Sequence, residues 1–201
     1  CRYCSSYIPV RYAIVELLTA TTLTLLVLQT TSIIEGVLAA TLAAVLVMIV
    51  VYDIYHLIIP DEFVITLSLL ALALWFAGGS SLETLTTAAY AALLASAFYW
   101  SLWRLSAGRW IGFGDVKLAL PLGFMSDLGG VFSLVVLSFW VGAAISLMLL
   151  GVTYLKQGKT KSPTSRTQLT MKSEVPFAPF MVAAFLLVYV FQIDVLTWFV
   201  L

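Results

Sequence analysis

The sequence predicts an all-helical protein that crosses a membrane several times, with about six to eight spans in one bundle. Hydrophobic residues make up 62% of the 201 residues, charged residues only 10%, and the mean hydropathy is +1.08. An ordinary soluble domain is about 45–50% apolar and about 25% charged. The apolar residues also form long stretches, and the basic residues are confined to alternate connections between them. A soluble globular fold and a disordered chain are therefore both excluded.

Seven apolar stretches are candidate membrane spans, since about 20 apolar residues cross a bilayer as a helix. They cover residues 13–28, 33–52, 63–77, 85–103, 116–125, 131–155 and 175–191. The fourth stretch is rich in Ala and Ser, which favours close packing between helices over contact with lipid. The fifth is short and contains Pro121, so we expect it to be broken, tilted or only partly inserted.

The basic residues predict the orientation, because cytoplasmic connections carry an excess of Lys and Arg. With a cytoplasmic N-terminus, the inside segments hold all ten Lys and Arg residues: 1–12, 53–62, 104–117 and 156–174. The outside connections hold none: 29–32, 78–84 and 126–130. The sequence therefore predicts a multi-pass protein of the cytoplasmic (inner) membrane. The polar segment 157–174 is expected to be a flexible cytoplasmic loop.

Net charge and cysteine content narrow the possible partners. The net charge is zero, so nothing indicates binding to nucleic acid. The two cysteines, Cys1 and Cys4, form one CxxC, and a disulfide between them would close a very small loop. A metal or redox role is therefore favoured over a structural disulfide. The chain begins with Cys and not Met, so we expect further residues to precede it.

Four acids are candidates for function, because ionisable groups at membrane level are costly. Glu16, Asp53, Asp61 and Asp115 all fall at the predicted cytoplasmic ends of spans. Glycines flank Asp115 in residues 112–114, which allows close backbone approach and a positive φ. Asp53 and Asp115 share one membrane level, as a two-carboxylate protease requires. One carboxylate activates water, the other protonates the carbonyl oxygen, and their repulsion keeps one proton between them.

Simpler interpretations remain open for each residue taken alone. Asp115 at a helix start is commonly an N-cap, and Asp53 fits an interfacial anchor or the proton site of a transporter. His56, the only histidine, is more commonly a hydrogen-bonding residue than a catalyst. Lys117 fits a positive-inside anchor or a partner that keeps Asp115 ionised. Two acids at equal depth favour proteolysis over a small proton-coupled transporter, whose acids are expected near the bilayer midplane, and over an inactive scaffold subunit.

Four blocks of the sequence, in order along the chain, resemble the type IV prepilin peptidases, which are GxGD-type membrane aspartic proteases. Cys1-Arg2-Tyr3-Cys4 is similar to the second CxxC of the family's cytoplasmic zinc-binding segment. Residues 53–61, ending in Ile-Pro-Asp, are similar to the first catalytic block. Residues 112–118 match the second block, GxGDxKL, and residues 176–180 resemble the PFGP block, with Ala178 in place of Gly.

The resemblance implies that Asp53 and Asp115 are the catalytic pair. The supporting residues that it implies are Glu16, Pro60, Asp61, Gly112, Gly114 and Lys117. Residues 1–12 would be the end of the zinc-binding segment, and residues 13–201 the transmembrane protease domain. Structural zinc normally takes four ligands, so Cys1 and Cys4 would need two further cysteines upstream of the chain.

The resemblance also implies an activity and its partners. A family member removes the short, positively charged leader of prepilins and pseudopilins, after a Gly, at the cytoplasmic face of the membrane, for type IV pili or type II secretion. Many bacterial members then methylate the new N-terminus with S-adenosylmethionine. The regions tied to methylation lie mostly toward the N-terminus, so we expect that activity only in a full-length protein. The expected partners are prepilin substrates and the lipid bilayer.

Overall fold

The structure is a computed structural model that describes residue 7, residues 9–157 and residues 176–200. Every element in this part of the chain is a helix, as the composition predicts. The helices are α1 (Val10–Val27), α2 (Ile33–His56), α3 (Asp61–Ala77), α4 (Leu82–Ser106), α5 (Phe113–Met125), α6 (Asp127–Gln157), α7 (Ala178–Phe191) and α8 (Val195–Val200). The first seven contain the seven predicted spans almost residue for residue.

Four of the described helices, α1, α2, α4 and α6, are long and apolar enough to cross a membrane. The helices α3, α5 and α7 are shorter, with 17, 13 and 14 residues. At 1.5 Å per residue they extend about 20–25 Å, against about 30 Å for the hydrocarbon core of a bilayer. The prediction of a polytopic helical membrane protein is confirmed, with a mixture of full-length and short helices in its bundle.

The short fifth span is an unbroken helix. Pro121 lies inside α5 without ending it, so the expectation of a break at this position is wrong. Proline removes one backbone hydrogen bond from a helix. The packing of α4 along α5 holds the two helices together, and neighbouring helices commonly compensate such a loss in membrane proteins.

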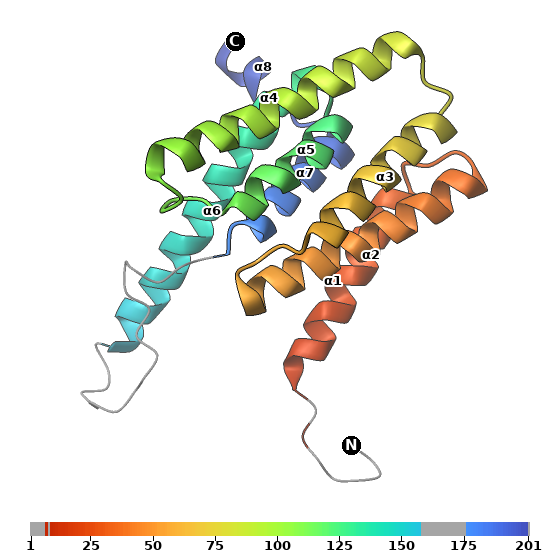
Figure 1. Cartoon of the computed structure of the whole chain (residues 1–201). Coiled ribbons are helices and arrows are strands. Elements are labelled where there is room, and N and C mark those ends of the chain that lie inside the picture. Colours follow the sequence, from red (N-terminus) through yellow and green to blue (C-terminus); the bar gives the residue numbers. More distant parts are fainter. Residues whose placement is uncertain (1–6, 8, 158–175, 201) are drawn as a thin grey trace.

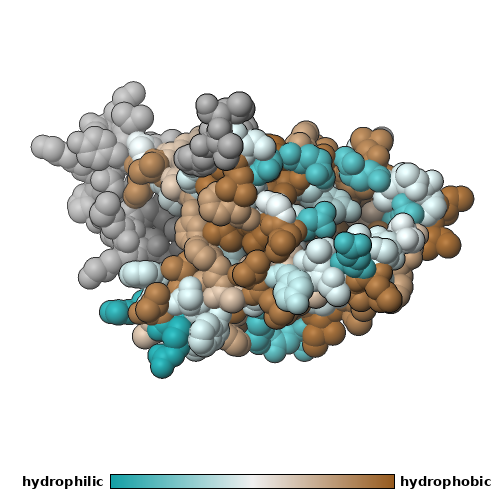
Figure 2. Space-filling model, turned by 90° about the horizontal axis from the view of Figure 1, so that it is seen from above, coloured by the Kyte–Doolittle hydropathy of each residue, from teal (hydrophilic) through white to brown (hydrophobic). Residues whose placement is uncertain are grey.

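The outer surface of the bundle is strongly apolar. Large hydrophobic side chains are exposed on each of the long helices, among them Leu17 on α1, Met48 on α2, Leu93 on α4 and Leu147 on α6. Apolar side chains cover much of the face seen in Figure 2, between smaller polar patches. Because exposed apolar area is unfavourable in water, this surface is suited to contact with lipid.

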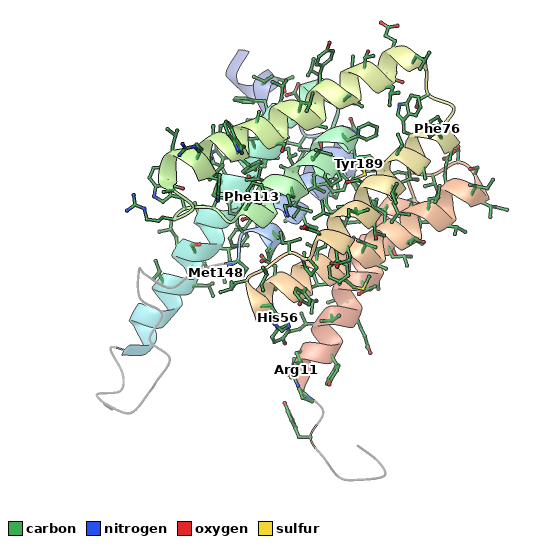
Figure 3. All side chains as sticks on the ribbon, viewed as in Figure 1. Arg11, His56, Phe76, Phe113, Met148 and Tyr189 are labelled. Atoms are coloured by element: carbon green, nitrogen blue, oxygen red, sulfur yellow. The ribbon has the colours of Figure 1, made fainter. Side chains whose placement is uncertain are left out.

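The helices run alternately up and down the bundle. The start of α1, the α2–α3 and α4–α5 connections, the end of α6 and the start of α7 lie toward one end, at the lower left of Figure 1. Arg11, His56 and Phe113 lie toward this end, whereas Phe76 and Tyr189 lie toward the other (Figure 3). The described parts of the four segments that hold all the basic residues therefore lie toward one end of the bundle. The segment 158–174, predicted to be a flexible loop, lies outside the described residues.

The bundle has two halves with a seam between them. The helices α1 and α3 both pack on α2, whereas α4 packs on α5 and α6 packs on α7. Contacts of α3 with α5 and of α2 with α7 join the two halves. In Figure 1, α5 and α7 lie between α4 and α6 on one side and α1 to α3 on the other. The ends of α2, α3, α5 and α7 therefore meet at this seam.

The contact between α4 and α5 is built from small residues, as the Ala- and Ser-rich sequence of the fourth span predicts. Ala91, Ala92 and Ala95 of α4 are buried and face Gly123 of α5. A Cβ atom added to Gly123 would lie 2.7 Å from the Cβ of Ala95 and 2.9 Å from the carbonyl oxygen of Ala91. The backbones approach closely because these side chains are absent or small.

We therefore expect Gly123→Ala to destabilise the protein by about 1–3 kcal/mol, the usual cost of overpacking a tightly packed site. Ala91 contributes backbone atoms to the clash, and backbone cannot rotate away. The measurement is thermal unfolding in detergent micelles. Gly151→Ala on α6 is the matched control, because a Cβ there meets nothing within 4 Å. Equal unfolding temperatures for the two variants would contradict the close contact.

Candidate active site

Asp53 lies in the last turn of α2, with 5% of its surface exposed. The helix ends three residues later, at His56, because Leu57 adopts the left-handed conformation with φ 54° and donates its N–H to the Asp53 carbonyl oxygen. The Asp53 Oδ2 atom accepts a hydrogen bond of 3.2 Å from the backbone N–H of Ala178, the first residue of α7. The carboxyl group of α2 is thus held by the N-terminus of a helix from the other half of the bundle, where a negative charge is favoured.

Asp115 lies in the first turn of α5, with 7% of its surface exposed. Gly112 is the N-cap residue, so the interpretation of Asp115 as an N-cap is wrong by position. Its Oδ2 atom nevertheless accepts a hydrogen bond of 3.2 Å from the backbone N–H of Gly112. Each acid is therefore held through one oxygen by a backbone donor at a helix N-terminus.

Gly114 permits the approach of α5 to the loop that follows α2. A Cβ atom added to it would lie 3.1 Å from the Cβ of Ile59, which is buried. The prediction of close backbone approach is thus confirmed. The expectation of a positive φ is wrong: Gly112 has φ −71°, and the described glycines with positive φ are Gly79 and Gly108. The glycines at this turn matter for space and not for a left-handed conformation.

Both acids line one cavity of about 340 Å³, which we call the acid cavity. Its wall consists of Asp53, Asp61, Asp115, Lys117, the loop residues 57–59, and residues 112–114 at the start of α5. The two connections that carry the Ile-Pro-Asp and GxGD blocks therefore form one site, although they lie more than 50 residues apart in the sequence. The arrangement offers two carboxyl groups, each oriented by a backbone N–H, on a shared space that a peptide bond can enter.

Pro60 and Asp61 begin α3 at the edge of the acid cavity. Pro60 is the N-cap residue of α3, with φ −59° and ψ 140°, and the proline ring itself favours this φ. Asp61 is the first helical residue, and its Oδ1 atom lies 2.6 Å from the Nζ atom of Lys117 on α5. The Lys117 ammonium also lies 5.1 Å from the centre of the Phe113 ring. The ion-pair partner of Lys117 is thus Asp61, and not Asp115 as one interpretation of the sequence has it.

We expect Lys117→Met and Asp61→Asn to reduce activity only modestly, by about fivefold or less. The two side chains are 36% and 63% exposed, so water screens their attraction, and such pairs contribute about 1 kcal/mol or less. The measurement is a double-mutant cycle on kcat/KM. Either single substitution already breaks the ion pair, so the effects of the two substitutions should not add in the double variant. A loss of several hundredfold in either single variant would contradict the modest contribution of this ion pair.

The remaining sequence candidates lie away from the acid cavity. Glu16 is exposed on α1, and it is not part of the cavity wall. The His56 ring packs against Tyr52 at a tilt of 38°, with 4.4 Å between ring centres, and lines a separate groove between α1 and α2. Cys1 and Cys4 lie outside the described residues. Within the described ranges no group of three or more His, Cys, Asp or Glu side chains could hold a metal ion.

One contributor was not assigned from the sequence, namely the backbone of Ala178. The Pro-Phe-Ala-Pro-Phe block at residues 176–180 is the signal that could have identified it, because a block resembling a family pattern begins α7 beside Asp53. Tyr99 fixes this block in place. Its hydroxyl group lies 2.7 Å from the Ser138 hydroxyl, and its ring packs edge-on against Phe177 with 5.9 Å between ring centres.

Comparison with known proteins agrees with this site. A model of the type IV leader peptidase family matches residues 40–147, a range that includes Asp53 and Asp115. A prepilin leader peptidase/N-methyltransferase of Aeromonas hydrophila is 32% identical over 92% of this chain. Proteins of the same name from Aeromonas salmonicida and Xanthomonas campestris pv. campestris are 31% and 26% identical over 92% and 91% of it. No solved structure matches the chain.

The chain is shorter than these relatives. It spans 59% of the length of the two Aeromonas proteins and 60% of the length of the Xanthomonas protein. The range matched by the family model, residues 40–147, contains both acids of the cavity.

Proposed function

The chain belongs to the type IV leader peptidase family, and on this premise we propose that it is a membrane-embedded aspartic endopeptidase. Its proposed substrates are type IV prepilins and pseudopilins, from which it removes the basic leader. The observation that carries this proposal is the acid cavity, where two buried carboxyl groups from α2 and α5 meet. Their separate backbone donors, Ala178 N–H and Gly112 N–H, support a fixed orientation for both.

The proposed reaction uses Asp53 and Asp115 as one acid–base pair. The ionised carboxylate takes a proton from water, and the water oxygen attacks the carbonyl carbon of the scissile peptide bond. The protonated carboxyl group gives its proton to the carbonyl oxygen, and a tetrahedral intermediate forms. When the C–N bond breaks, the carboxyl group that took the water proton gives it to the leaving nitrogen, which becomes the new N-terminus of the product. A hydroxyl group of the intermediate returns its proton to the other carboxylate, so the pair again holds one proton. The pair is then ready for another water molecule.

Other hydrolytic mechanisms have less support. His56, the only histidine of the chain, packs against Tyr52 and is not part of the acid cavity wall, so no Ser–His or Cys–His pair is available there. A proton-coupled transporter would favour acids near the middle of spans. Asp53 lies in the last turn of α2 and Asp115 in the first turn of α5, which favours a site at the membrane surface.

We place this site on the cytoplasmic side. All ten Lys and Arg residues fall in segments that adjoin the end of the bundle carrying the acid cavity, which by the positive-inside rule is the cytoplasmic end. A basic leader would then remain in the cytoplasm while the apolar segment that follows it enters the bilayer. The cleaved bond would lie between the two, at the depth of Asp53 and Asp115.

We propose zinc binding and methylation only for a longer protein that includes this chain. Cys1 and Cys4 supply two thiolates, half of the usual four-ligand zinc set. We propose that two cysteines upstream of Cys1 complete a structural site, which metal analysis of a longer chain would detect. Any methylation with S-adenosylmethionine would likewise need that upstream part.

The direct test is cleavage of a recombinant prepilin by the 201-residue chain in liposomes. We expect mass spectrometry to detect two products, the basic leader ending in Gly and the shortened pilin. An intact prepilin after prolonged incubation would contradict the proposal.

The pH dependence provides a further prediction. Activity should pass through a maximum and fall on both sides, because the mechanism needs one protonated and one ionised carboxyl group. The measurement is kcat/KM across the pH range in which the protein stays folded. Lys117→Met should leave the positions of both limbs nearly unchanged, since its partner is Asp61. A rate that rises to a plateau without a second limb would contradict the shared-proton mechanism.

A further inference from the structure

An apolar groove opens between α3 and α4, with α5 as its floor. Its volume is about 700 Å³, twice that of the acid cavity. On α4 it is lined by Leu93, Ser96, Ala97 and Trp100, which recur at intervals of three and four residues. Such spacing forms a stripe along one face of a helix, so the groove runs parallel to the helices. The stripe covers about two turns, or roughly 10 Å of helix axis.

The groove suits an apolar occupant. Leu69 of α3 is 63% exposed, and Leu93 of α4 is 61% exposed, so both walls present uncovered hydrophobic side chains. The two hydroxyl groups in its lining already have acceptors. Ser68 donates to the Val64 carbonyl oxygen at 2.8 Å, and Ser96 donates to the Val116 carbonyl oxygen at 3.1 Å. A polar ligand would therefore find few partners here.

The groove adjoins the acid cavity. Asp61, Phe113 and Lys117 line both spaces, so the Asp61–Lys117 ion pair lies where one opens into the other. A peptide whose scissile bond lies between Asp53 and Asp115 can therefore continue directly into the groove. The part of the peptide that enters the groove must be apolar, because the groove is lined mainly by apolar side chains.

The charges at the junction suit a basic segment on the other side of the cleaved bond. Asp61 and Glu62 begin α3 and are both exposed, and Lys117 balances only the first of them. A substrate that carries positive charge before the bond and an apolar helix after it would match both ends of this surface. Free lipid chains match only the apolar part.

We propose that the apolar groove binds the first two helical turns of the hydrophobic segment that follows the cleaved bond of the substrate. This inference rests on the proposed function and adds to it where the substrate lies. Binding in the groove fixes the register of the peptide, so that only one bond reaches the acid cavity. The groove is thus a specificity-determining surface for prepilins.

Photo-crosslinking tests the proposal with two adjacent leucines of α4. Leu93 lines the groove, whereas Leu94 is similarly exposed, at 54%, but is not part of its lining. A photoreactive phenylalanine analogue replaces one or the other in the 201-residue chain, which also carries Asp115→Asn to preserve the substrate. We expect the analogue at 93 to crosslink to the apolar segment of a recombinant prepilin, and the analogue at 94 to crosslink to lipid. Equal prepilin crosslinking at both positions, or lipid alone at both, would overturn the proposal.

Kinetics provide the second test. Ala97→Trp fills the groove, and Leu94→Trp is its matched control on the same helix. The compared substrates are a full prepilin and a short peptide with only the leader and the cleavage junction. The ratio measured is kcat/KM for the full prepilin divided by kcat/KM for the short peptide. For Ala97→Trp we expect this ratio to fall about tenfold or more, mainly through a higher KM for the prepilin, because the burial of one large apolar side chain is lost. The control should leave this ratio unchanged.

These measurements distinguish a wrong assignment of the groove from a wrong assignment of the peptidase activity. An unchanged ratio for Ala97→Trp, with the wild-type chain cleaving both substrates, would overturn the groove assignment and leave the peptidase intact. A wild-type chain that cleaves neither substrate would overturn the peptidase and, with it, the groove assignment.

Discussion

Replacing Asp53 or Asp115 by Asn is expected to reduce prepilin cleavage by about 10³-fold or more, since each change removes one half of the acid–base pair. Asn keeps an oxygen that can accept the hydrogen bond now made by Oδ2, from Ala178 N–H or Gly112 N–H. The contact between α2 and α7 should therefore survive, and the loss should appear in kcat. The measurement is processing in liposomes, with folding checked by the unfolding temperature.

Asp61→Asn is the matched control for these variants. Asp61 lines the same cavity, but it is exposed and paired with Lys117 at the rim. Asp61→Asn should lose no more than about fivefold in activity, whereas the variants of the two buried acids should lose about 10³-fold or more. Substantial residual cleavage by either Asp53→Asn or Asp115→Asn would eliminate the two-aspartate mechanism.

Gly114→Val is expected to lower kcat by about 10²-fold, the effect of a misplacement of about 1 Å in a catalytic group. A side chain at this position would press on the Cβ, Cγ1 and Cδ1 atoms of Ile59, at 3.1 to 3.4 Å for a Cβ alone. The start of α5 would then shift away from the loop after α2, and Asp115 would move relative to Asp53. The measurement is kcat for a prepilin, together with the unfolding temperature.

Two further variants separate this effect from general damage. Gly151→Val on α6 places the same side chain where nothing lies within 4 Å of a Cβ, so activity should be unchanged. Ile59→Ala removes two of the three crowding atoms and should restore part of the activity when combined with Gly114→Val. If the double variant were no more active than Gly114→Val alone, crowding against Ile59 would not be the cause.

The sequence was sufficient for most of the fold because membrane spans are encoded locally. A continuous apolar stretch such as residues 33–52 predicts α2 with few alternatives, since lipid admits no unpaired backbone. The short helix α8 was not predicted, because only apolar stretches long enough to span a membrane give this local signal. It has six residues, too few for a span, and it depends on contacts from elsewhere, such as the hydrogen bond from Val195 N–H to the Ser133 hydroxyl.

The site was predicted only in part, because its polar contacts join residues far apart in the chain. The two acids could be identified from their glycine and proline neighbours and from their common membrane level. The pairing of Lys117 with Asp61, 56 residues away, depends on how α3 packs against α5. Sequence spacing alone placed Lys117 nearer to Asp115, two residues earlier on the same helix turn.

The hydrogen bond between Ala178 and Asp53 also has a consequence for the synthesis of the protein, because it joins an early helix to a late one. Its two partners are 125 residues apart, and ribosomes add about 5–20 residues per second. On the order of ten seconds therefore pass between the synthesis of Asp53 and that of its backbone donor. Asp115 is added about halfway through this interval, so during its second half the nascent chain holds both carboxyl groups without the backbone donor of the first. The site therefore reaches the arrangement described above only after α7 has been made, although both acids belong to earlier helices.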